Sequence, residues 1–457
     1  MDADMAELLD LARKVVAWSS DGEQVEAYAA HSRDADVEVY QGDIETLSSA
    51  ETDGVGIRVV LPGPNGNRQG FAYTGALDDA SLRATFVEAR DNALFGTPDQ
   101  FVGLARPDGA AAADLPIWDD ALLTFSTDAK IELAMELERL VRAGDSRIRS
   151  LRSASYGDGF VEVAIVSTEG IESTFRRTNC SLVAYAIAGD EGDTQTGFGY
   201  SVGRSPYDLD VAKAASMAVE RATRLLGSVK PSSRRTTVVF DPYVTASLLG
   251  ILGGTVNGES VQKGRSLFAG RIGDAVAVPG LTLIDDPVNP LAYGATPFDA
   301  EGLATRRIPL IADGILQGFV HNSVSARRAG NGVVSTGSAV RGGFKGTPGV
   351  GCRALSLTPG TRSAAEILGD VGEAVLVQSI SGVHSGVNPV SGDFSVGAEG
   401  LVIRDGELAE PIREFTIAST LQRMLLDVTA IGSDLEWLPG GSAGVTLAVS
   451  GMSLSGA

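Results

Sequence analysis

The spacing of the histidines and cysteines indicates whether this sequence can form a zinc site or a disulfide framework. The three histidines are His31, His321 and His384, and no two of them lie four or five residues apart. A helical zinc site built on paired histidines therefore cannot form from them. Cys180 and Cys352 are far apart and form no CxxC pair, so neither a disulfide framework nor a cysteine zinc site is indicated.

A serine nucleophile is a second possibility, because residues 199–203 match the GxSxG pattern around Ser201. That pattern requires the serine at a sharp turn directly between a strand and a helix. Here Ser201 falls inside a predicted strand, and the next predicted helix begins only after residues 204–206. A serine hydrolase using Ser201 is therefore kept as an alternative hypothesis, with the motif in an unsuitable context.

The charge balance narrows the classes of partner. The chain has 37 Lys and Arg and 58 Asp and Glu, which gives a formal net charge of −21. Nucleic-acid binding depends on clustered Lys and Arg, and the sequence has no basic stripe, so no nucleic-acid partner is expected.

No stretch approaches the roughly 18 apolar residues that span a membrane, and the acidic N-terminus is unlike a signal peptide. We expect a soluble, cytoplasmic protein without a membrane partner.

The elements that would position these residues follow from the periodicity of the first half of the chain. Apolar residues at helical spacing predict helices over 3–18, 78–94, 127–143 and 207–226. Alternating residues predict strands that include 54–61, 147–156, 160–168, 171–178 and 180–188. His31 is expected to follow a strand and to lie on the surface.

The second half of the chain is richer in glycine and in short strands. A helix is predicted from Pro242, and it runs into a Gly-rich turn. Asp-Gly pairs at 313–314 and 405–406 lie between apolar runs and predict two hairpins. The expected fold class is α+β, with N-terminal α/β sheet domains followed by a Gly-rich, mostly antiparallel β domain. Composition places the boundaries of an N-terminal, a central and a C-terminal domain at 1–110, 111–230 and 231–457.

Several segments of the chain contain combinations of residue types that are more specific than ordinary turns require. They are VQKGRSLFAGRIG (261–273), PFDAEGLATRR (297–307), SARR (325–328), NPVSGDFSVGAEG (388–400) and AIGSDL (430–435). Together with GVGIRVV and GFAYT near the N-terminus, these runs resemble the TldD/PmbA (TldE) family of peptidase subunits, once called modulators of DNA gyrase. The resemblance covers nearly the whole chain.

The resemblance implies where zinc would be bound in one of the two kinds of subunit. The TldD kind holds zinc through His-Glu-x-x-x-His on a helix before the Lys-Gly pair, and through a Cys near the C-terminus. Counted back from Lys263, the three positions hold Leu249, Gly250 and Gly254, and residues 437–441 contain no Cys. Zinc catalysis needs three protein ligands and an open position. The chain therefore resembles the TldE (PmbA) kind, with no cofactor of its own and zinc expected in the partner subunit.

A partner and a substrate class are implied in the same way. The resemblance implies a heterodimer with a TldD-type, zinc-bearing subunit that degrades unfolded peptides or processes leader peptides. In that heterodimeric metallopeptidase this chain is expected to be inactive alone, to shape the chamber and to bind the substrate while the partner hydrolyses it. The alternative hypotheses are a metal-free peptide-binding homodimer without peptidase activity, and the serine hydrolase using Ser201.

The loop 381–393 is where the resemblance implies contact with the substrate. Its glycines allow close backbone approach, and an extended peptide could be held by strand addition. Asn388 and Asp393 could equally well cap local turns. The candidate substrate-binding residues are His384, Ser385, Asn388, Ser391, Asp393 and His321.

Overall fold

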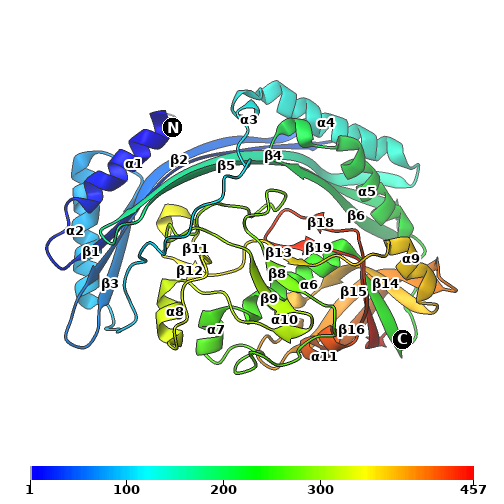
Figure 1. Ribbon diagram of the computed structural model, residues 1–457. Coiled ribbons are helices and arrows are strands. Elements are labelled where there is room, and N and C mark those ends of the chain that lie inside the picture. The colour runs from blue at the N-terminus through cyan, green and yellow to red at the C-terminus, as the bar shows by residue number, and fades with distance from the viewer. Residues whose placement is uncertain (1–2) are drawn as a thin grey trace.

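A long, curved antiparallel sheet arches over the rest of the molecule in this computed structural model, which describes residues 3–457 (Figure 1). The strand order is β3-β2-β1-β4-β5-β6. The strands are β1 (Gln24–Tyr40), β2 (Asp43–Leu61), β3 (Arg68–Thr74), β4 (Ile148–Ser167), β5 (Glu172–Asp190) and β6 (Asp193–Gly203). Because β1 pairs with β4, the predicted N-terminal and central domains contribute to one sheet. The boundaries at 1–110, 111–230 and 231–457 remain a proposed division.

Helices cover only the convex face of this sheet (Figure 1). They are α1 (Ala3–Val16), α2 (Asp79–Phe95), α3 (Ala121–Thr124), α4 (Thr127–Gly144) and α5 (Val211–Arg224), with a 3-10 turn at Pro206–Asp208. The strands alternate accordingly: Ala27 and Ala29 pack under α1 and α2, whereas Tyr28 and Ala30 face the concave side. Val37 joins the second apolar cluster, under α4 and α5.

Three details of the sheet differ from the prediction. The strands predicted at 147–156 and 160–168 form the single strand β4 (Ile148–Ser167), and those predicted at 171–178 and 180–188 form the single strand β5 (Glu172–Asp190). His31 lies inside β1 instead of after a strand, and its Nδ1 lies 2.8 Å from Asp53 Oδ1 across the pair β1–β2. The last predicted helix of this half, 207–226, is shortened to α5 because Pro206 opens a separate 3-10 turn.

The C-terminal region (231–457) lies beneath the concave face and contains several small sheets (Figure 1). Its largest sheet has the order β16-β15-β14-β7-β20-β17, and an additional β16–β20 pairing closes five of these strands on themselves. These strands are β7 (Arg234–Phe240), β14 (Ala374–Ser381), β15 (Asp393–Arg404), β16 (Glu407–Thr420), β17 (Val428–Ile431) and β20 (Leu447–Ser455). All pairs are antiparallel except β14–β7. The expected α+β class with a mostly antiparallel C-terminal region is confirmed.

Shorter strands and helices complete this region. A four-stranded sheet, β10-β9-β8-β13, consists of β8 (Leu283–Asp285), β9 (Ile308–Ala312), β10 (Ile315–Leu316) and β13 (Leu355–Leu357). Two ribbons pair β11 (Ala339–Val340) with β12 (Gly349–Val350), and β18 (Glu436–Trp437) with β19 (Ala443–Gly444). The helices are α6 (Pro242–Thr255), α7 (Gly258–Gln262), α8 (Ser323–Ala329), α9 (Ala364–Asp370), α10 (Val383–Gly386) and α11 (Leu421–Leu426).

Both predicted Asp-Gly hairpins are present. Asp313 and Gly314 join β9 to β10, and Asp405 and Gly406 join β15 to β16. All four residues have positive φ, as a two-residue turn of this kind requires. The first hairpin is shorter than predicted because β10 ends at Leu316.

The concave face touches the C-terminal region through separate apolar contacts. Tyr28 and Ile165 pack with Phe344 near one end of the sheet, and Tyr200 packs with Ala246 and Leu438 near the other. Between them, polar side chains on the concave face remain accessible to solvent. Asp34 and Asp36 on β1 are exposed, and Arg177, Asn179 and Ser181 on β5 are partly exposed.

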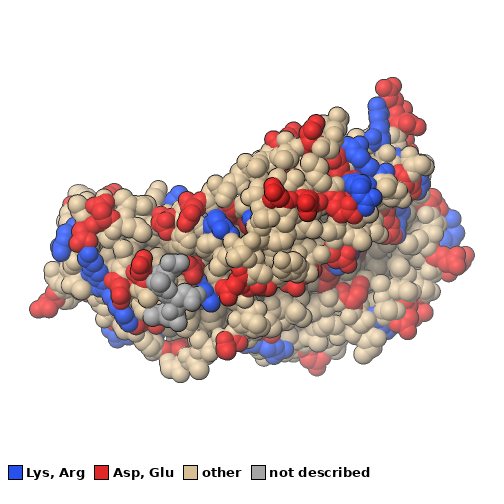
Figure 2. Space-filling view, turned by 90° about the horizontal axis from the view of Figure 1, so that it is seen from above, with Lys and Arg blue, Asp and Glu red and all other residues tan. Residues whose placement is uncertain are grey.

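The convex side carries charges of both signs. Acidic and basic side chains are interspersed over its helices, and this face shows no continuous basic area (Figure 2). No helix between residues 3 and 457 is long and apolar enough to cross a membrane.

Candidate functional site

Helix α6 is the element to which the resemblance assigns metal chemistry, and its sequence explains why it forms. Asp241 caps its N-terminus, where the side chain accepts a hydrogen bond from the backbone N–H of Val244 at 2.8 Å. Pro242 occupies the first turn, where its missing N–H is not needed. Most of the helix is buried in the largest apolar cluster of the molecule, so tertiary packing stabilises a helix that contains three glycines.

The three positions that would carry zinc chemistry face different environments on this helix. Leu249 is only 2% exposed and packs among leucines around an apolar void of about 30 Å³. Gly250 and Gly254 are exposed, and a Cβ placed on either would have no other atom within 4 Å. A leucine in the core and two residues without side chains offer no ligand. Zinc does not fit the residues present on α6.

The segment where the resemblance would place a third ligand lies close to the same helix. The backbone N–H of Leu355 donates to the carbonyl of Gly441 at 2.8 Å, which holds residues 437–441 beside β13. Cys352 comes from the same neighbourhood, since its Sγ would lie 4.0 Å from a Cβ at Gly253. Burial raises the pKa of this thiol well above its usual value, so the thiolate form that binds metals is disfavoured. Among residues 3–457 no three His, Cys, Asp or Glu side chains are grouped as a metal site.

The candidate loop 381–393 is tied to the C-terminal end of α6 by two hydrogen bonds. Leu267 N–H donates to the carbonyl of Pro389 at 3.2 Å, and the Ser266 hydroxyl donates to the carbonyl of Thr255 at 2.6 Å. The loop contains the short helix α10, which starts after Gly382 at a φ of 73°. Position 382 therefore uses a left-handed conformation that glycine adopts without strain. The fold thus brings this loop next to the helix with the altered metal positions.

Within the loop, the candidate polar residues are exposed, and several are engaged locally. Asn388 Oδ1 accepts from the backbone N–H groups of Val390 and Ser391, at 2.9 and 3.3 Å. The Ser391 hydroxyl donates to Asp393 at 2.6 Å, and the Ser385 hydroxyl donates to the carbonyl of Gly382 at 3.2 Å. Asn388 therefore shapes the loop, and its side chain has part of its hydrogen-bonding capacity already used.

The two histidines among the candidates have opposite environments. His384 is exposed on α10. His321 is 6% exposed, its Nδ1 lies 3.1 Å from the Ser325 hydroxyl, and its ring packs against Gly258. Burial lowers the pKa of His321, so the neutral imidazole is favoured. His384 has the geometry of a contact residue, whereas His321 fills space between α7 and α8.

Ser201 lies within β6, as the sequence indicated. Its side chain is buried, and its Oγ accepts a hydrogen bond from the backbone N–H of Asp210 at 2.9 Å. Asp210 is in turn the N-cap of α5. The hydroxyl therefore helps to start a helix on the convex side, away from the strand-to-helix turn that a nucleophile of this motif occupies.

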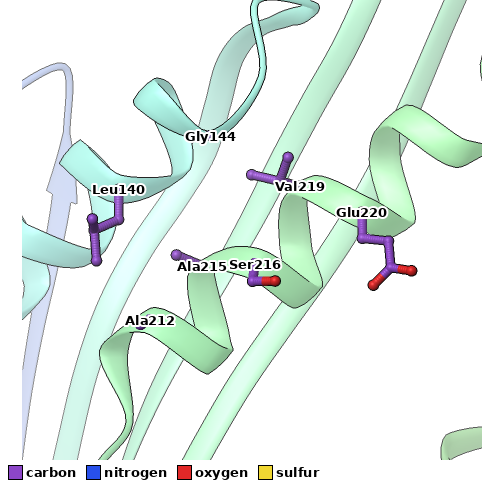
Figure 3. A pocket seen from close by; sticks show the side chains of 7 residues that line it. All are labelled: Leu140, Gly144, Ala212, Ala215, Ser216, Val219 and Glu220. Carbon is purple, nitrogen blue, oxygen red and sulfur yellow. The ribbon is translucent and has the colours of Figure 1, made fainter.

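Two surface depressions lie elsewhere. One, of about 400 Å³, is a groove between α4 and α5 lined mainly by small and aliphatic residues (Figure 3). Its single ionisable side chain, Glu220, points away from α4. A second, of about 410 Å³, is lined by His31, Glu51 and Asp53 with leucines of α1. The first contains one hydroxyl, that of Ser216, with no histidine or lysine beside it, and the second contains His31 but no Ser, Thr or Cys.

Sequence reasoning missed a group of arginines on the concave side. Arg177 on β5 repels both Arg204, which follows β6, and Arg353 of the C-terminal region. Burial, followed by the charge of Arg177, lowers the pKa of Arg204 to about 10. We call these three residues the arginine cluster. No local sequence signal marks them, because they come from segments up to 176 positions apart (353 − 177).

Comparison with known proteins gives consistent matches along the chain. Models described as PmbA/TldA metallopeptidase domain 1, central domain and C-terminal domain match residues 25–93, 120–226 and 233–456. The "Metalloprotease PmbA" of Escherichia coli O157:H7 is 28% identical over 435 residues, which are 94% of this chain and 92% of the relative. A "Metalloprotease TldD homolog" of Haemophilus influenzae is 26% identical over 400 residues, 84% of this chain and 80% of the relative.

Solved structures share the fold over almost the full length. A protein from Thermotoga maritima described as a modulator of a DNA gyrase has a TM-score of 0.87 at 25% identity, covering 99% of both chains. TldE from Thermococcus kodakarensis has a TM-score of 0.88 at 23% identity, covering 99% of this chain and 100% of the other. At that identity the second likeness shows the fold alone.

Proposed function

This chain belongs to the PmbA/TldD metallopeptidase family, and we propose that it is a non-catalytic, TldE (PmbA)-type subunit. In this proposal it pairs with a TldD-type subunit that carries zinc, and the heterodimer degrades unfolded peptides or processes leader peptides in the cytoplasm. The partner hydrolyses the peptide bond. This chain shapes the chamber and holds the substrate.

The proposal rests mainly on the residues that occupy the three zinc-ligand and catalytic positions of α6. Leu249 is built into the apolar core, and Gly250 and Gly254 present bare backbone to solvent. A metal-binding helix needs ligands that converge on one point from one face. On α6 the first position points into the protein and the other two have no side chains, so the chemistry of a zinc hydrolase is assigned to another chain.

Substrate contact is proposed for the loop 381–393. His384 and Ser385 are exposed on α10, and Asp393 begins β15. The loop is anchored beside α6, so a peptide held there would lie near the surface that corresponds to the partner's metal site. Backbone-directed binding suits unfolded peptides of varied sequence, because it reads the main chain instead of side chains.

Reconstitution tests whether the partner hydrolyses the peptide bond while this chain alone is inactive. This chain and a paralogue bearing His-Glu-x-x-x-His are purified separately, and cleavage of an unstructured peptide is measured for each chain and for the mixture. Zinc is measured per chain. We expect cleavage with the mixture, loss of cleavage with a chelator, and zinc only in the paralogue. A paralogue with its motif glutamate changed to glutamine is the matched inactive control.

The alternatives predict different results. Cleavage by this chain alone that survives the chelator and disappears in Ser201→Ala would identify a serine hydrolase and contradict the proposal. Peptide binding without hydrolysis, even after the zinc-bearing paralogue is added, would instead support a peptide-binding homodimer.

A further inference from the structure

One half of strand β2 has no neighbouring strand on its outer side. β1 pairs with β2 along nearly its whole length, whereas β3 pairs only with Val55–Leu61. Among residues 3–457 no strand and no isolated bridge covers the outer side of residues 43–53. We call this stretch the open edge. Every second residue of such an edge directs its backbone N–H and C=O to solvent, where they can pair with another strand.

The side chains of the open edge are as accessible as its backbone. All residues from 43 to 51 are exposed, although they belong to a sheet of six strands. Leu47 is 53% exposed, whereas Val37, its partner on β1, is fully buried. The stretch contains no Lys and no Pro, which are the residues that commonly prevent pairing at exposed edges. The open edge is therefore suited to accept an added strand.

A cavity of about 410 Å³ lies at one end of the open edge, on the convex side. Its acidic side chains are Glu7 of α1 and Glu51 and Asp53 of the open edge, and His31 and three leucines complete the lining. His31 Nδ1 lies 2.8 Å from Asp53, and its Nε2 lies 3.6 Å from Glu51. The cavity thus combines apolar walls with several carboxylates.

The carboxylates of this cavity exceed the positive charge around them. Among residues 3–457 no Lys or Arg forms an ion pair with Glu7, Glu51 or Asp53. Arg33 is opposite Glu51 on β1, but its guanidinium lies over the ring of Phe160, 5.1 Å from the ring centre. A single histidine cannot neutralise three carboxylates. A cation with an aliphatic stem therefore suits the cavity in both charge and shape.

We propose that the open edge binds an extended segment of an unfolded, basic peptide, which adds a strand to the sheet and places a Lys or Arg side chain in the cavity. Main-chain hydrogen bonds hold the strand, and the cavity selects the side chain. Neighbouring strands lie about 4.8 Å apart, so a side chain of the added strand must reach over β2, and Lys and Arg are long enough to do so. The ligand, an unfolded peptide, comes from the proposed function, on which the inference rests in this respect.

Charge distinguishes this ligand from a second copy of the chain. The open edge contains four acidic residues, which are Asp43, Glu45, Glu51 and Asp53, and no basic residue. In an antiparallel pair of two copies centred on Ser48, each of these acidic residues would face an acidic residue of the other copy. Like charges directly opposite each other destabilise a strand pair. The open edge therefore disfavours its own copy and favours a basic strand.

The surroundings of the open edge suit a single chain better than the sheet of a folded partner. β2 follows the curve of the sheet, and its pairing with β1 contains an irregularity between Glu38 and Val39 (Figure 1). At the other end, a Cβ on Gly75 would lie 3.4 Å from the carbonyl of Asp53, and α1 forms one wall of the cavity. A rigid sheet would have to match this shape, whereas an unfolded segment adapts to it.

Hydrogen exchange of the full chain locates the added strand. The probe is an unstructured peptide of alternating Lys and Thr, as long as the open edge, and its control is the same peptide methylated at every backbone nitrogen. The two peptides have the same charge and are attracted equally to a chain of net charge −21, but the control has no N–H donors. We expect slower exchange at residues 43–53 with the unmethylated peptide only. Equal protection by both peptides, or protection by neither, would overturn the proposal.

Substitutions test the cavity. The double variant Glu7→Gln and Glu51→Gln removes two of its carboxylates, and the double variant Glu88→Gln and Glu132→Gln removes two exposed carboxylates from α2 and α4 as a matched control. The Lys-containing peptide is expected to bind about tenfold more weakly to the first double variant and as in the wild type to the second. Equal binding to all three proteins would contradict the cavity as the site of the basic side chain. All four side chains are exposed, so both variants are expected to fold normally.

Failure of the open edge and failure of the proposed function give different results. If the reconstituted pair cleaves peptides but no peptide protects residues 43–53, the open edge is wrong and the proposed function stands. If the peptide protects residues 43–53 but the pair cleaves nothing, the open edge stands and the proposed function is wrong. Protection of residues 43–53 by the zinc-bearing paralogue and by no peptide would assign this edge to the subunit interface and overturn the proposal.

Discussion

Leu249 and Gly250 are consecutive on α6 and face opposite environments. The leucine is 2% exposed inside the apolar core, whereas a Cβ at Gly250 would have no other atom within 4 Å. Adjacent helical residues point about 100° apart, so one can belong to the core and the next to the surface. The position that would hold the first zinc ligand is therefore part of the packing, and the next position has no side chain.

Substitutions on α6 should separate these two environments. Gly250→Ala is expected to raise the free energy of unfolding by about 0.5–1 kcal/mol, because it adds helix propensity in open space. Gly253→Ala, three residues away, is expected to lower it by about 1–3 kcal/mol, because its Cβ would stand 2.7 Å from Leu355 Cδ1. Urea denaturation measures both, and equal effects of the two variants would contradict the assignment of faces.

Restoring the ligand residues gives a sharper test of the same helix. Leu249→His places an imidazole in an apolar core and is expected to cost about 2–5 kcal/mol of stability. The triple variant that adds Gly250→Glu and Gly254→His is expected to bind no stoichiometric zinc, because its histidines would not converge. Zinc content after dialysis, with Gly250→Glu plus Gly254→His as the control, checks this expectation.

A buried ion network joins the sheet to the C-terminal region. Glu26 accepts from Arg58 at 2.5 Å and from Arg341 at 2.7 Å, and the three side chains are at most 3% exposed. Glu26→Gln leaves the buried Arg341 without its carboxylate partner and leaves Arg58 with only Glu301, 3.9 Å away, so we expect a loss of about 3–5 kcal/mol. The exposed pair between Arg13 and Glu172 is the control, and Glu172→Gln should change stability little.

The pH dependence of that network has a definite sign. Burial raises the pKa of Glu26, but the attraction of Arg58 and Arg341 outweighs burial and leaves the pKa below its usual value. A lowered folded-state pKa contributes stability above the unfolded value of about 4.3, and this contribution is lost as the pH falls through the folded value. The stability gap between wild type and Glu26→Gln should therefore narrow below about pH 4. A gap that widens on acidification would contradict the lowered pKa.

The sequence was most informative where local signals determine structure. The predicted helix 127–143 became α4 (Thr127–Gly144), because Ser126 caps it and its apolar residues follow one face. The Asp405–Gly406 turn was predicted from two residues that both adopt positive φ. In contrast, the predicted strands 147–156 and 160–168 left out residues 157–159, which include Gly157 and Gly159. They lie inside β4, at places where the side chains of Asp36 and Asp34 cross over the strand.

The candidate site was predictable only in part. The positions of α6 could be counted back from Lys263, but which of them face the core needed the fold. The arginine cluster could not be found from sequence, because Arg177, Arg204 and Arg353 meet only when β5, the end of β6 and the segment before β13 are brought together. Single arginines between polar neighbours carry no local pattern that distinguishes them from surface residues.

Asp285 should produce a second pH effect, opposite in sign to that of Glu26. Burial raises its pKa to about 6, so the folded state binds a proton that the unfolded state has already lost. Stability due to this group is present below the unfolded value of about 3.9 and declines as the pH rises toward 6. Asp285→Asn keeps an acceptor for the backbone N–H of Arg353. We expect it to reduce the slope of the free energy of unfolding against pH between pH 4 and 6, each limit lying within about half a pH unit. Thermal melts across that range measure the slope, and an unchanged slope would contradict the raised pKa.

The two candidate histidines should respond differently to the same substitution. His321→Ala removes a buried ring that packs against Gly258 and contacts the Ser325 hydroxyl, so we expect a loss of about 1–3 kcal/mol in stability. His384→Ala removes an exposed ring on α10 and should leave the melting temperature unchanged. If the loop 381–393 contacts the substrate, the same variant should weaken peptide cleavage by the reconstituted heterodimer through a higher KM. If the heterodimer with His384→Ala cleaves the peptide normally and the heterodimer with His321→Ala has a higher KM, the two assignments would be reversed.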